Sequence, residues 1–211
     1  MPKLLTVIGV GLVGLMAPAL LAAAALATIG NAAAGATGSS LVSEMQAFGY
    51  ENGRLPAVAL EVVSTHGAYE CRVATTGGAA EAWMALVEAA TADGLEIEGG
   101  WCYRSYDEQL AVWRARRCFI PGNCDGDPFP PTAEPGTSVH GWGLAIDVWG
   151  RGDVTLGCLS GEFLWMQINA PTFGWVHPIW AQCGKDSAEP WHWEYRGLIE
   201  SVEPDGSEIP S

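Results

Sequence analysis

The chain has 211 residues, which is about the length of one domain with accessory segments, and its formal net charge is −14. Binding to phosphate groups needs clustered Lys and Arg, so this charge balance argues against a nucleic-acid partner. Hydrophobic residues make up 49% of the sequence, which suffices for a sizeable core. Composition therefore favours a compact acidic domain and leaves its substrate open.

An apolar run without charges occupies residues 4–29. At a rise of about 1.5 Å per residue, a helix of that length spans a hydrocarbon core of ~30 Å. Small residues follow the run and offer sites of the kind that signal peptidases cleave. We therefore predict a signal peptide or a membrane anchor at 1–36, with the choice between them open. Either alternative predicts an exported protein, secreted or tethered to the membrane, that faces outward in the cell envelope.

The remaining chain divides by composition into three parts. Small residues at 37–49 predict a linker, and the segment at 50–200 predicts a single folded domain. Residues 201–211 form a polar tail. Residues 44–76 mix short apolar runs with Gly and Pro, so we expect loops with one or two short strands there.

Apolar residues at helical spacing predict a helix over 79–92, ended by the Asp-Gly pair that follows it. A strand is expected at 95–103. The sequence from Ser105 to Glu108 then matches a capping box that opens a second helix, with Tyr106, Leu110 and Trp113 facing the core.

The Pro- and Gly-rich segment at 118–139 predicts an ordered loop. Further strands are expected at 143–149 and 191–196, with a short helix at 161–169 whose N-cap is Ser160. Strands and helices do not alternate regularly. The predicted fold class is therefore α+β, a small antiparallel sheet with flanking helices.

All six cysteines follow the apolar segment, and an even number in an exported chain indicates disulfides. Cys118 and Cys124 flank a Pro-Gly-Asn turn and are the pair that we expect first. The other pairings stay open, because sequence alone does not choose among them. No C-x-x-C spacing occurs, which argues against a zinc site built from thiolates.

Two of the four histidines lie in sequences suited to metal binding. His140 is followed seven positions later by Asp147, and His192 lies in a Glu-Pro-Trp-His segment that begins at Glu189. A catalytic zinc takes three ligands from His and carboxylate side chains and leaves a fourth position for water. We therefore predict a metal site formed by His140, Asp147 and His192.

A hydrolytic zinc site also needs a base and a group that stabilises negative charge. Zinc lowers the pKa of bound water towards ~7, so a nearby carboxylate can accept its proton. Glu189 is the predicted base, and Glu194 is the alternative because it shares the face of His192 on a regular strand. Arg104, between a strand and a helix, is predicted to stabilise the developing oxyanion.

These segments together resemble a known family. The pattern Ser138-x-His140-x-x-Gly-x-Ala-x-Asp147, followed by Glu-x-Trp-His, is similar to the zinc D-alanyl-D-alanine carboxypeptidases and D,D-dipeptidases. Their superfamily includes lysostaphin-type peptidases and the hedgehog signalling domain. The Tyr-Arg-Ser segment around Arg104, with Gln109 downstream, extends the likeness.

The resemblance implies zinc held by His140, Asp147 and His192, with Glu189 as general base and Arg104 polarising the scissile carbonyl. It also implies that Ser138 and Gln109 contact the substrate. The expected substrate is a peptidoglycan stem peptide, cut at its terminal D-Ala-D-Ala bond. Two alternatives stay open: an endopeptidase that cuts another cell-wall bond, such as L-alanyl-D-glutamate, and a non-catalytic wall-binding module that keeps the zinc fold.

Overall fold

A computed structural model describes residues 38–124 and 132–198 of the chain. The predicted leader at 1–36 and the predicted tail at 201–211 lie outside these residues. Within the two described ranges, no helix has both the length and the apolar character needed to cross a membrane.

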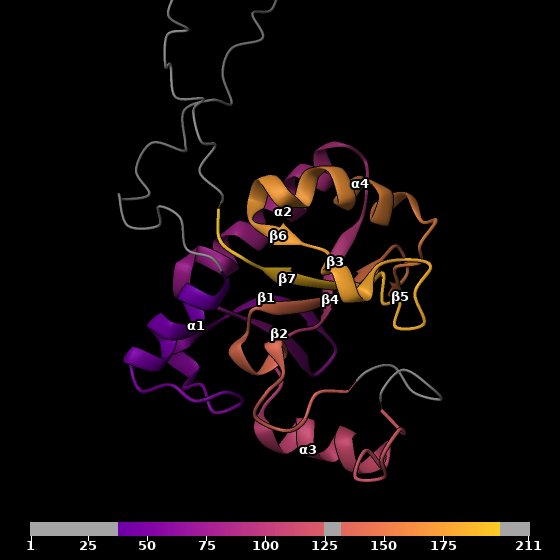
Figure 1. The fold of residues 1–211 in the computed structure, drawn as a ribbon. Coiled ribbons are helices and arrows are strands. Elements are labelled where there is room, and N and C mark those ends of the chain that lie inside the picture. The colour runs from indigo at the N-terminus through magenta and orange to yellow at the C-terminus, as the bar shows by residue number, and fades with distance from the viewer. Residues whose placement is uncertain (1–37, 125–131, 199–211) are drawn as a thin grey trace, which may run out of the picture. The chain divides into compact units, whose positions relative to one another are not determined.

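Five antiparallel strands form the central sheet (Figure 1). In spatial order they are β3 (Ile97–Trp101), β4 (Ala145–Gly150), β7 (His192–Tyr195) and β6 (Trp175–Val176), with β5 (Val154–Thr155) paired to β4. A separate hairpin consists of β1 (Leu60–His66) and β2 (Tyr69–Ala74). The predicted α+β class is confirmed, and each predicted strand is present, shortened or shifted by a few residues.

Helices α2 (Ala79–Ala92) and α4 (Gly161–Asn169) lie on one side of this sheet (Figure 1). Trp83 of α2 packs edge-on against Trp175 of β6, with 5.4 Å between ring centroids. The Ser160 side chain accepts a hydrogen bond from the Phe163 backbone and caps α4. Both helices agree with the sequence prediction. Short 3₁₀ helices span Ala57–Ala59, Thr76–Gly78, Val139–Trp142, Ala170–Phe173 and Ile179–Ala181.

The predicted linker at 37–49 is wrong for most of its length, because α1 spans Gly38–Ala47. Leu41 and Met45, four residues apart on one helix face, are 1% and 0% exposed and belong to the core. The small residues around them suggested a spacer. The burial of this apolar pair on the domain instead supports a helix, since most helix stability comes from packing of an apolar face.

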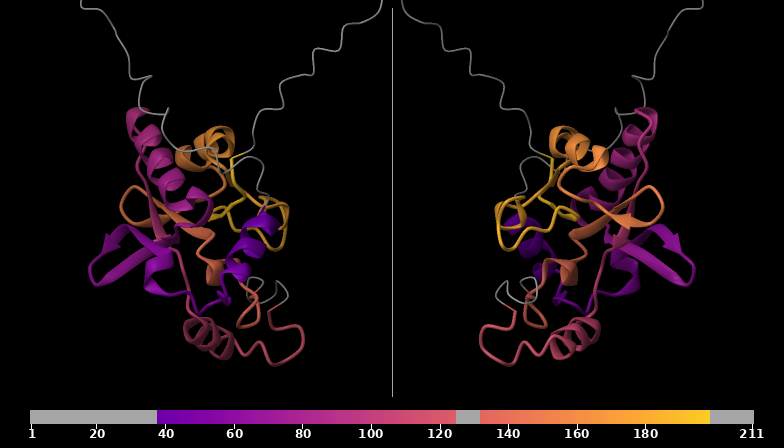
Figure 2. Two further views of the ribbon diagram at one scale, coloured as in Figure 1. Left: turned by 90° about the vertical axis from the view of Figure 1, so that its left-hand side faces the viewer. Right: turned by 90° about the vertical axis from the view of Figure 1, so that its right-hand side faces the viewer.

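Helix α3 (Tyr106–Ala115) begins with the predicted capping box, in which Ser105 and Glu108 exchange hydrogen bonds. The prediction that Tyr106, Leu110 and Trp113 face the core is wrong. These side chains are half-buried outside the core cluster, and Gln109 is the buried residue of the helix. The reason is the position of α3, which lies apart from α2 and α4 at the other end of the domain (Figures 1 and 2).

The cysteines form three disulfides, Cys71–Cys102, Cys118–Cys124 and Cys158–Cys183. The pair expected first, Cys118–Cys124, is confirmed. It closes the loop that follows α3, whereas Cys71–Cys102 joins β2 to the end of β3.

Candidate active site

The three predicted metal ligands come together from two strands and a short helix. Asp147 of β4 lies directly opposite His192 of β7 in the antiparallel register, and His140 belongs to the 3₁₀ helix before β4. The Asp147 Oδ1 atom is 3.1 Å from His192 Nδ1 and 3.4 Å from His140 Nε2. The two ring nitrogens are 3.3 Å apart.

These separations fit a tetrahedral zinc ion. Ligands about 2.0–2.1 Å from zinc at tetrahedral angles lie roughly 3.3 Å from one another. All three side chains are buried, so each ligand is held in place by its surroundings. The donor set, two imidazoles and one carboxylate, is also one that zinc prefers. The residues present therefore fit a catalytic zinc ion.

Hydrogen bonds on the outer side of each ring select the ligand atoms. His140 donates from Nδ1 to the Cys102 carbonyl over 2.8 Å, which leaves Nε2 for the metal. His192 donates from Nε2 to Glu194 Oε1 over 3.3 Å, which leaves Nδ1. Arg196 in turn donates to Glu194. Such partners fix the orientation and tautomer of a metal-binding histidine. Glu194 thus contacts the Nε2 atom of His192, whereas Asp147 contacts the Nδ1 atom.

The charges of the site keep its carboxylate ionised. Burial alone would raise the pKa of Asp147, but the charge of His140 and hydrogen bonds from both histidines hold that pKa far below its usual range. Burial opposes protonation of His192, yet hydrogen bonds to Asp147 and Glu194 outweigh burial and raise its pKa to about 9. Asp147 therefore carries the negative charge that a cation at this site needs.

Glu189 precedes β7 and lines the same cleft as the three ligands. Its backbone N–H donates to the Ala181 carbonyl over 2.9 Å, and its own carbonyl accepts from His192 N–H and from His177 Nε2. Burial raises the pKa of the Glu189 carboxyl to about 7. A carboxylate with a pKa near neutrality is well suited to accept and return a proton. Glu189 therefore stays the predicted base, and Glu194 the alternative.

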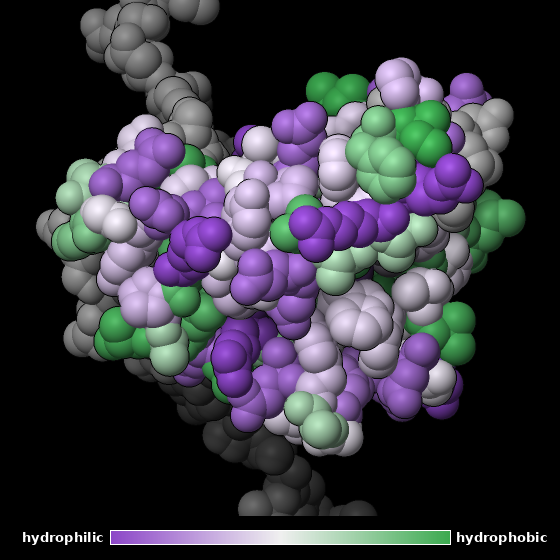
Figure 3. Space-filling model, turned by 90° about the horizontal axis from the view of Figure 1, so that it is seen from below, coloured by the Kyte–Doolittle hydropathy of each residue, from purple (hydrophilic) through white to green (hydrophobic). Residues whose placement is uncertain are grey.

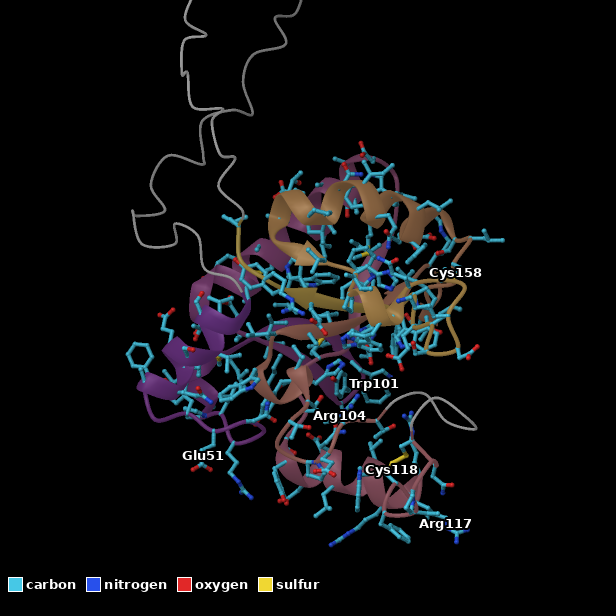
Figure 4. All side chains as sticks on the ribbon, viewed as in Figure 1. Glu51, Trp101, Arg104, Arg117, Cys118 and Cys158 are labelled. Atoms are coloured by element: carbon cyan, nitrogen blue, oxygen red, sulfur yellow. A yellow bond between two sulfur atoms is a disulfide. The ribbon has the colours of Figure 1, made fainter. Side chains whose placement is uncertain are left out.

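Arg104 lies between the sheet and α3 (Figure 4). Its Nη2 atom is 3.9 Å from Asp147 Oδ2, and its Nη1 atom donates to Gln109 Oε1 over 3.0 Å. The amide of Gln109 donates to the Ala133 carbonyl over 2.7 Å. Gln109 therefore accepts from Arg104 at one end of its amide and is anchored to Ala133 at the other. Its implied contact with substrate stays a prediction.

Ser138 also lines the cleft, at the start of the 3₁₀ helix that carries His140. Its carbonyl accepts a hydrogen bond from Asn52 over 2.7 Å. A side chain at Gly141 would place Cβ 2.1 Å from Asn52 Oδ1, so glycine is required there for close approach. Gly143 has a φ of 65°, a left-handed conformation that glycine adopts without strain. Both glycines set the path of the segment that carries His140.

The cleft has a volume of about 1090 Å³ and extends from the metal ligands along α3. The lining residues that the sequence did not indicate include Tyr69, Trp101, Arg116 and Trp180. Trp101 is 49% exposed, and the Trp180 ring lies 4.9 Å from the His192 ring. No motif marked these residues, because their roles depend on segments that meet only in the folded chain.

Known proteins resemble this chain in sequence and in fold. The sequence model of the VanY family, described as D-alanyl-D-alanine carboxypeptidase, matches residues 73–198. A D-alanyl-D-alanine carboxypeptidase of Enterococcus faecalis is 29% identical over 123 residues, which cover 54% of this chain and 45% of that protein. The chain thus spans somewhat less than half the length of this curated relative.

Two solved structures share the fold. VanYB in complex with D-Alanine-D-Alanine has a TM-score of 0.50 and 24% identity, covering 66% of this chain and 77% of its own. The LdcB LD-carboxypeptidase has a TM-score of 0.54 and 25% identity, and the match covers 69% of this chain and 71% of the LdcB chain. Because the family match covers more than half of the sequence, this chain belongs to the VanY family of D-alanyl-D-alanine carboxypeptidases.

Proposed function

We propose that this protein is a zinc-dependent D,D-carboxypeptidase that removes the terminal D-alanine from peptidoglycan stem peptides. One observation carries the proposal: a buried set of two histidines and an aspartate shares a cleft with Glu189 and Arg104. A purely structural metal site needs neither a base nor a cation facing the ligands. The site therefore favours a hydrolase over a non-catalytic wall-binding module.

His140, Asp147 and His192 would hold the zinc ion. When bound in such a site, zinc lowers the pKa of water and polarises a carbonyl oxygen. The Glu189 carboxylate accepts the proton of the attacking water. It then delivers that proton to the nitrogen of the leaving D-alanine, which departs as a free amino acid. A pKa near neutrality suits both transfers.

Arg104 supplies positive charge to the carbonyl oxygen as that oxygen becomes negative. Gln109 and the His140 carbonyl hold Arg104 from two sides, through its side chain and its backbone N–H. Charge stabilisation by a fixed group needs little reorganisation during the reaction, which is why such groups contribute strongly to rate. Arg104 is therefore the proposed electrophilic group of the reaction.

We also propose that the protein acts outside the cytoplasm, in the cell envelope. Three disulfides support this location, because disulfides persist in oxidising compartments. The apolar segment within residues 1–36 supports export, either as a cleaved signal or as a tether. Detection of the protein in cell fractions, with the mature N-terminus sequenced, tests the location and chooses between signal and tether.

The reaction is tested with the purified zinc-loaded protein and a synthetic pentapeptide stem that ends in D-Ala-D-Ala. Mass spectrometry should find free D-alanine and the tetrapeptide. Larger fragments would instead identify the endopeptidase, and cleavage of a tetrapeptide stem at its terminal L,D bond would identify an L,D-carboxypeptidase. A zinc-loaded protein that cleaves none of these peptides would support the non-catalytic alternative.

A further inference from the structure

One face of α3 forms a wall of the catalytic cleft. Gln109, Val112 and Arg116 all line the cleft, at positions i, i+3 and i+7 of the helix and its C-cap. Residues with this spacing share one helix face. Gln109 holds Arg104 at one end of the row. Arg116 lies two turns farther along, about 10 Å at 1.5 Å per residue.

The Arg116 side chain is fixed within the cleft. Its Nη1 atom donates to Thr132 Oγ1 over 2.7 Å, and its backbone N–H donates to the Val112 carbonyl over 3.0 Å. Because these hydrogen bonds already restrict the side chain, it loses less conformational entropy when a ligand binds. Arg116 is thus prepared to bind a group that enters the cleft.

Arg116 also differs from Arg104 in the acidic side chains that the described residues place near it. Across residues 38–124 and 132–198, no acidic side chain forms an ion pair with it, whereas Arg104 lies 3.9 Å from Asp147. The sequence holds 24 acidic residues against 10 Lys and Arg, so carboxylates are plentiful as partners. Among the described residues, Arg116 therefore lines the cleft without a carboxylate that would neutralise its charge.

The charge of Arg116 acts on the reacting end of the cleft. Burial raises the pKa of Glu189, and Arg116 is among the charges that lower it, together with Arg104. The two guanidinium groups thus contribute positive potential to one region, from opposite ends of the α3 face. An anion that enters the cleft meets both.

We propose that Arg116 binds a carboxylate of the peptide substrate, an inference that rests on the proposed peptidase function. A guanidinium pairs with a carboxylate through two parallel hydrogen bonds, which fix the position as well as the charge of the ligand. A stem peptide offers two sources of this group: its C-terminal carboxylate, and the free carboxylate of a residue before the scissile bond. Arg116 would make the cleft selective for acidic peptides.

Four synthetic substrates separate the two sources. Diacetyl-L-Lys-D-Ala-D-Ala has a C-terminal carboxylate alone, and its C-terminal amide has none. The pentapeptide L-Ala-γ-D-Glu-L-Lys-D-Ala-D-Ala has an additional upstream carboxylate, which the D-isoglutamine version lacks. Rates are measured with the zinc-loaded wild type, Arg116→Ala and Arg116→Lys. The control is Arg114→Ala, which removes an equal charge from an exposed position of α3 that does not line the cleft.

The loss of a hydrogen bond between charged groups typically weakens binding about 10- to 100-fold. Arg116→Ala should therefore raise KM by about that factor for each substrate that carries the recognised carboxylate, with a smaller change in kcat. For substrates without it the variant should equal the wild type. If the C-terminal carboxylate is the ligand, the tripeptide acid and both pentapeptides are affected, and the tripeptide amide is not. If the upstream carboxylate is the ligand, only the pentapeptide with γ-D-Glu is affected. Arg116→Lys should restore part of the affinity, and Arg114→Ala should change nothing.

An equal change of KM for all four substrates would overturn the proposal, as would no change for any. Zinc content and circular dichroism of each variant show whether a loss reflects a damaged fold. Calorimetric titration of the same peptides into the Glu189→Gln protein measures binding without turnover. If the wild type cleaves no peptide but Arg116→Ala still weakens this binding, the proposed reaction fails while the carboxylate site stands. If the wild type cleaves and binding is unaffected, the carboxylate site fails alone.

Discussion

The two walls of the catalytic cleft are constructed in different ways. On the sheet side, β4 and β7 carry Asp147 and His192 in paired register, and all four residues of β7 are buried. On the other side, α3 buries Gln109 alone among its ten residues, and polar side chains cover much of the surface seen from below (Figure 3). The first wall is part of the core, whereas the second is joined to the rest by loops and a few hydrogen bonds.

This difference indicates that the two walls have different functions. Backbone pairing fixes two of the predicted metal ligands, Asp147 and His192, so their geometry depends on the core of the domain. Arg104 and Arg116 instead donate side-chain hydrogen bonds to Gln109 and Thr132, which hold both guanidinium groups over the cleft. Changes on the sheet wall should therefore affect metal binding and turnover. Changes on the α3 wall should affect substrate binding.

The largest effect is expected at the metal ligands. His140→Ala, Asp147→Ala and His192→Ala should each abolish stoichiometric zinc binding, because a catalytic site has only three protein ligands. Elemental analysis after dialysis measures the zinc content. His177→Ala is the matched control, since His177 belongs to neither group of side chains that could hold a metal and does not line the cleft, and it should retain the metal. Zinc at wild-type stoichiometry in all three ligand variants would disprove the assignment.

The next largest effect concerns the base. Glu189→Gln should retain zinc and fold but lower kcat about 10²- to 10⁴-fold, because a neutral amide accepts no proton from water. The loss should appear in kcat more than in KM. Steady-state kinetics on the pentapeptide stem provide both constants. Near-normal turnover in Glu189→Gln, together with an inactive Glu194→Gln that still binds zinc, would reverse the roles of the two carboxylates.

Glu194→Gln should act on the metal instead. Its carboxylate accepts from His192 Nε2 and from Arg196, so its loss weakens the orientation of a ligand. Removal of such a partner typically lowers metal affinity about 10- to 100-fold. Competition with a chelator of known zinc affinity measures the change. Unchanged affinity would mean that β-sheet pairing alone orients His192.

The pH dependence of the reaction follows from Glu189. Burial raises the pKa of this carboxyl to about 7, and the base must be ionised to act. Activity should therefore fall about tenfold per pH unit below that pKa. The positive charge of bound zinc acts in the opposite direction to burial and lowers the pKa from this value. A pH profile of kcat/KM should show this acidic limb at or below pH 7. The same limb in the residual activity of Glu189→Gln would assign it to another group.

The smallest effect is expected on the α3 wall. Ser105→Ala removes the capping side chain of α3 and should lower the free energy of unfolding by about 1 kcal/mol. Chemical denaturation of the zinc-loaded protein measures the loss. Zinc affinity should stay at the wild-type value, because α3 carries no metal ligand. A clear drop in zinc affinity would show that the two walls are coupled.

The sequence by itself determined the features that depend on neighbours along the chain. Helical spacing identified α2, and the capping residues Ser105 and Ser160 identified the starts of α3 and α4. The short turn between Cys118 and Cys124 identified that disulfide. Motif spacing identified the family, which the match over residues 73–198 confirmed. Each of these signals is local, so composition and spacing suffice to read it.

Only the tertiary structure decided which faces are buried and which partners meet. Leu41 and Met45 enter the core although their segment resembles a linker, while the apolar residues of α3 stay at its margin. Glu194 turned out to be the partner of His192 Nε2, and Arg116 a part of the cleft. These outcomes depend on contacts between residues far apart in the sequence. Burial and ring orientation are set by such contacts, and spacing along the chain does not encode them.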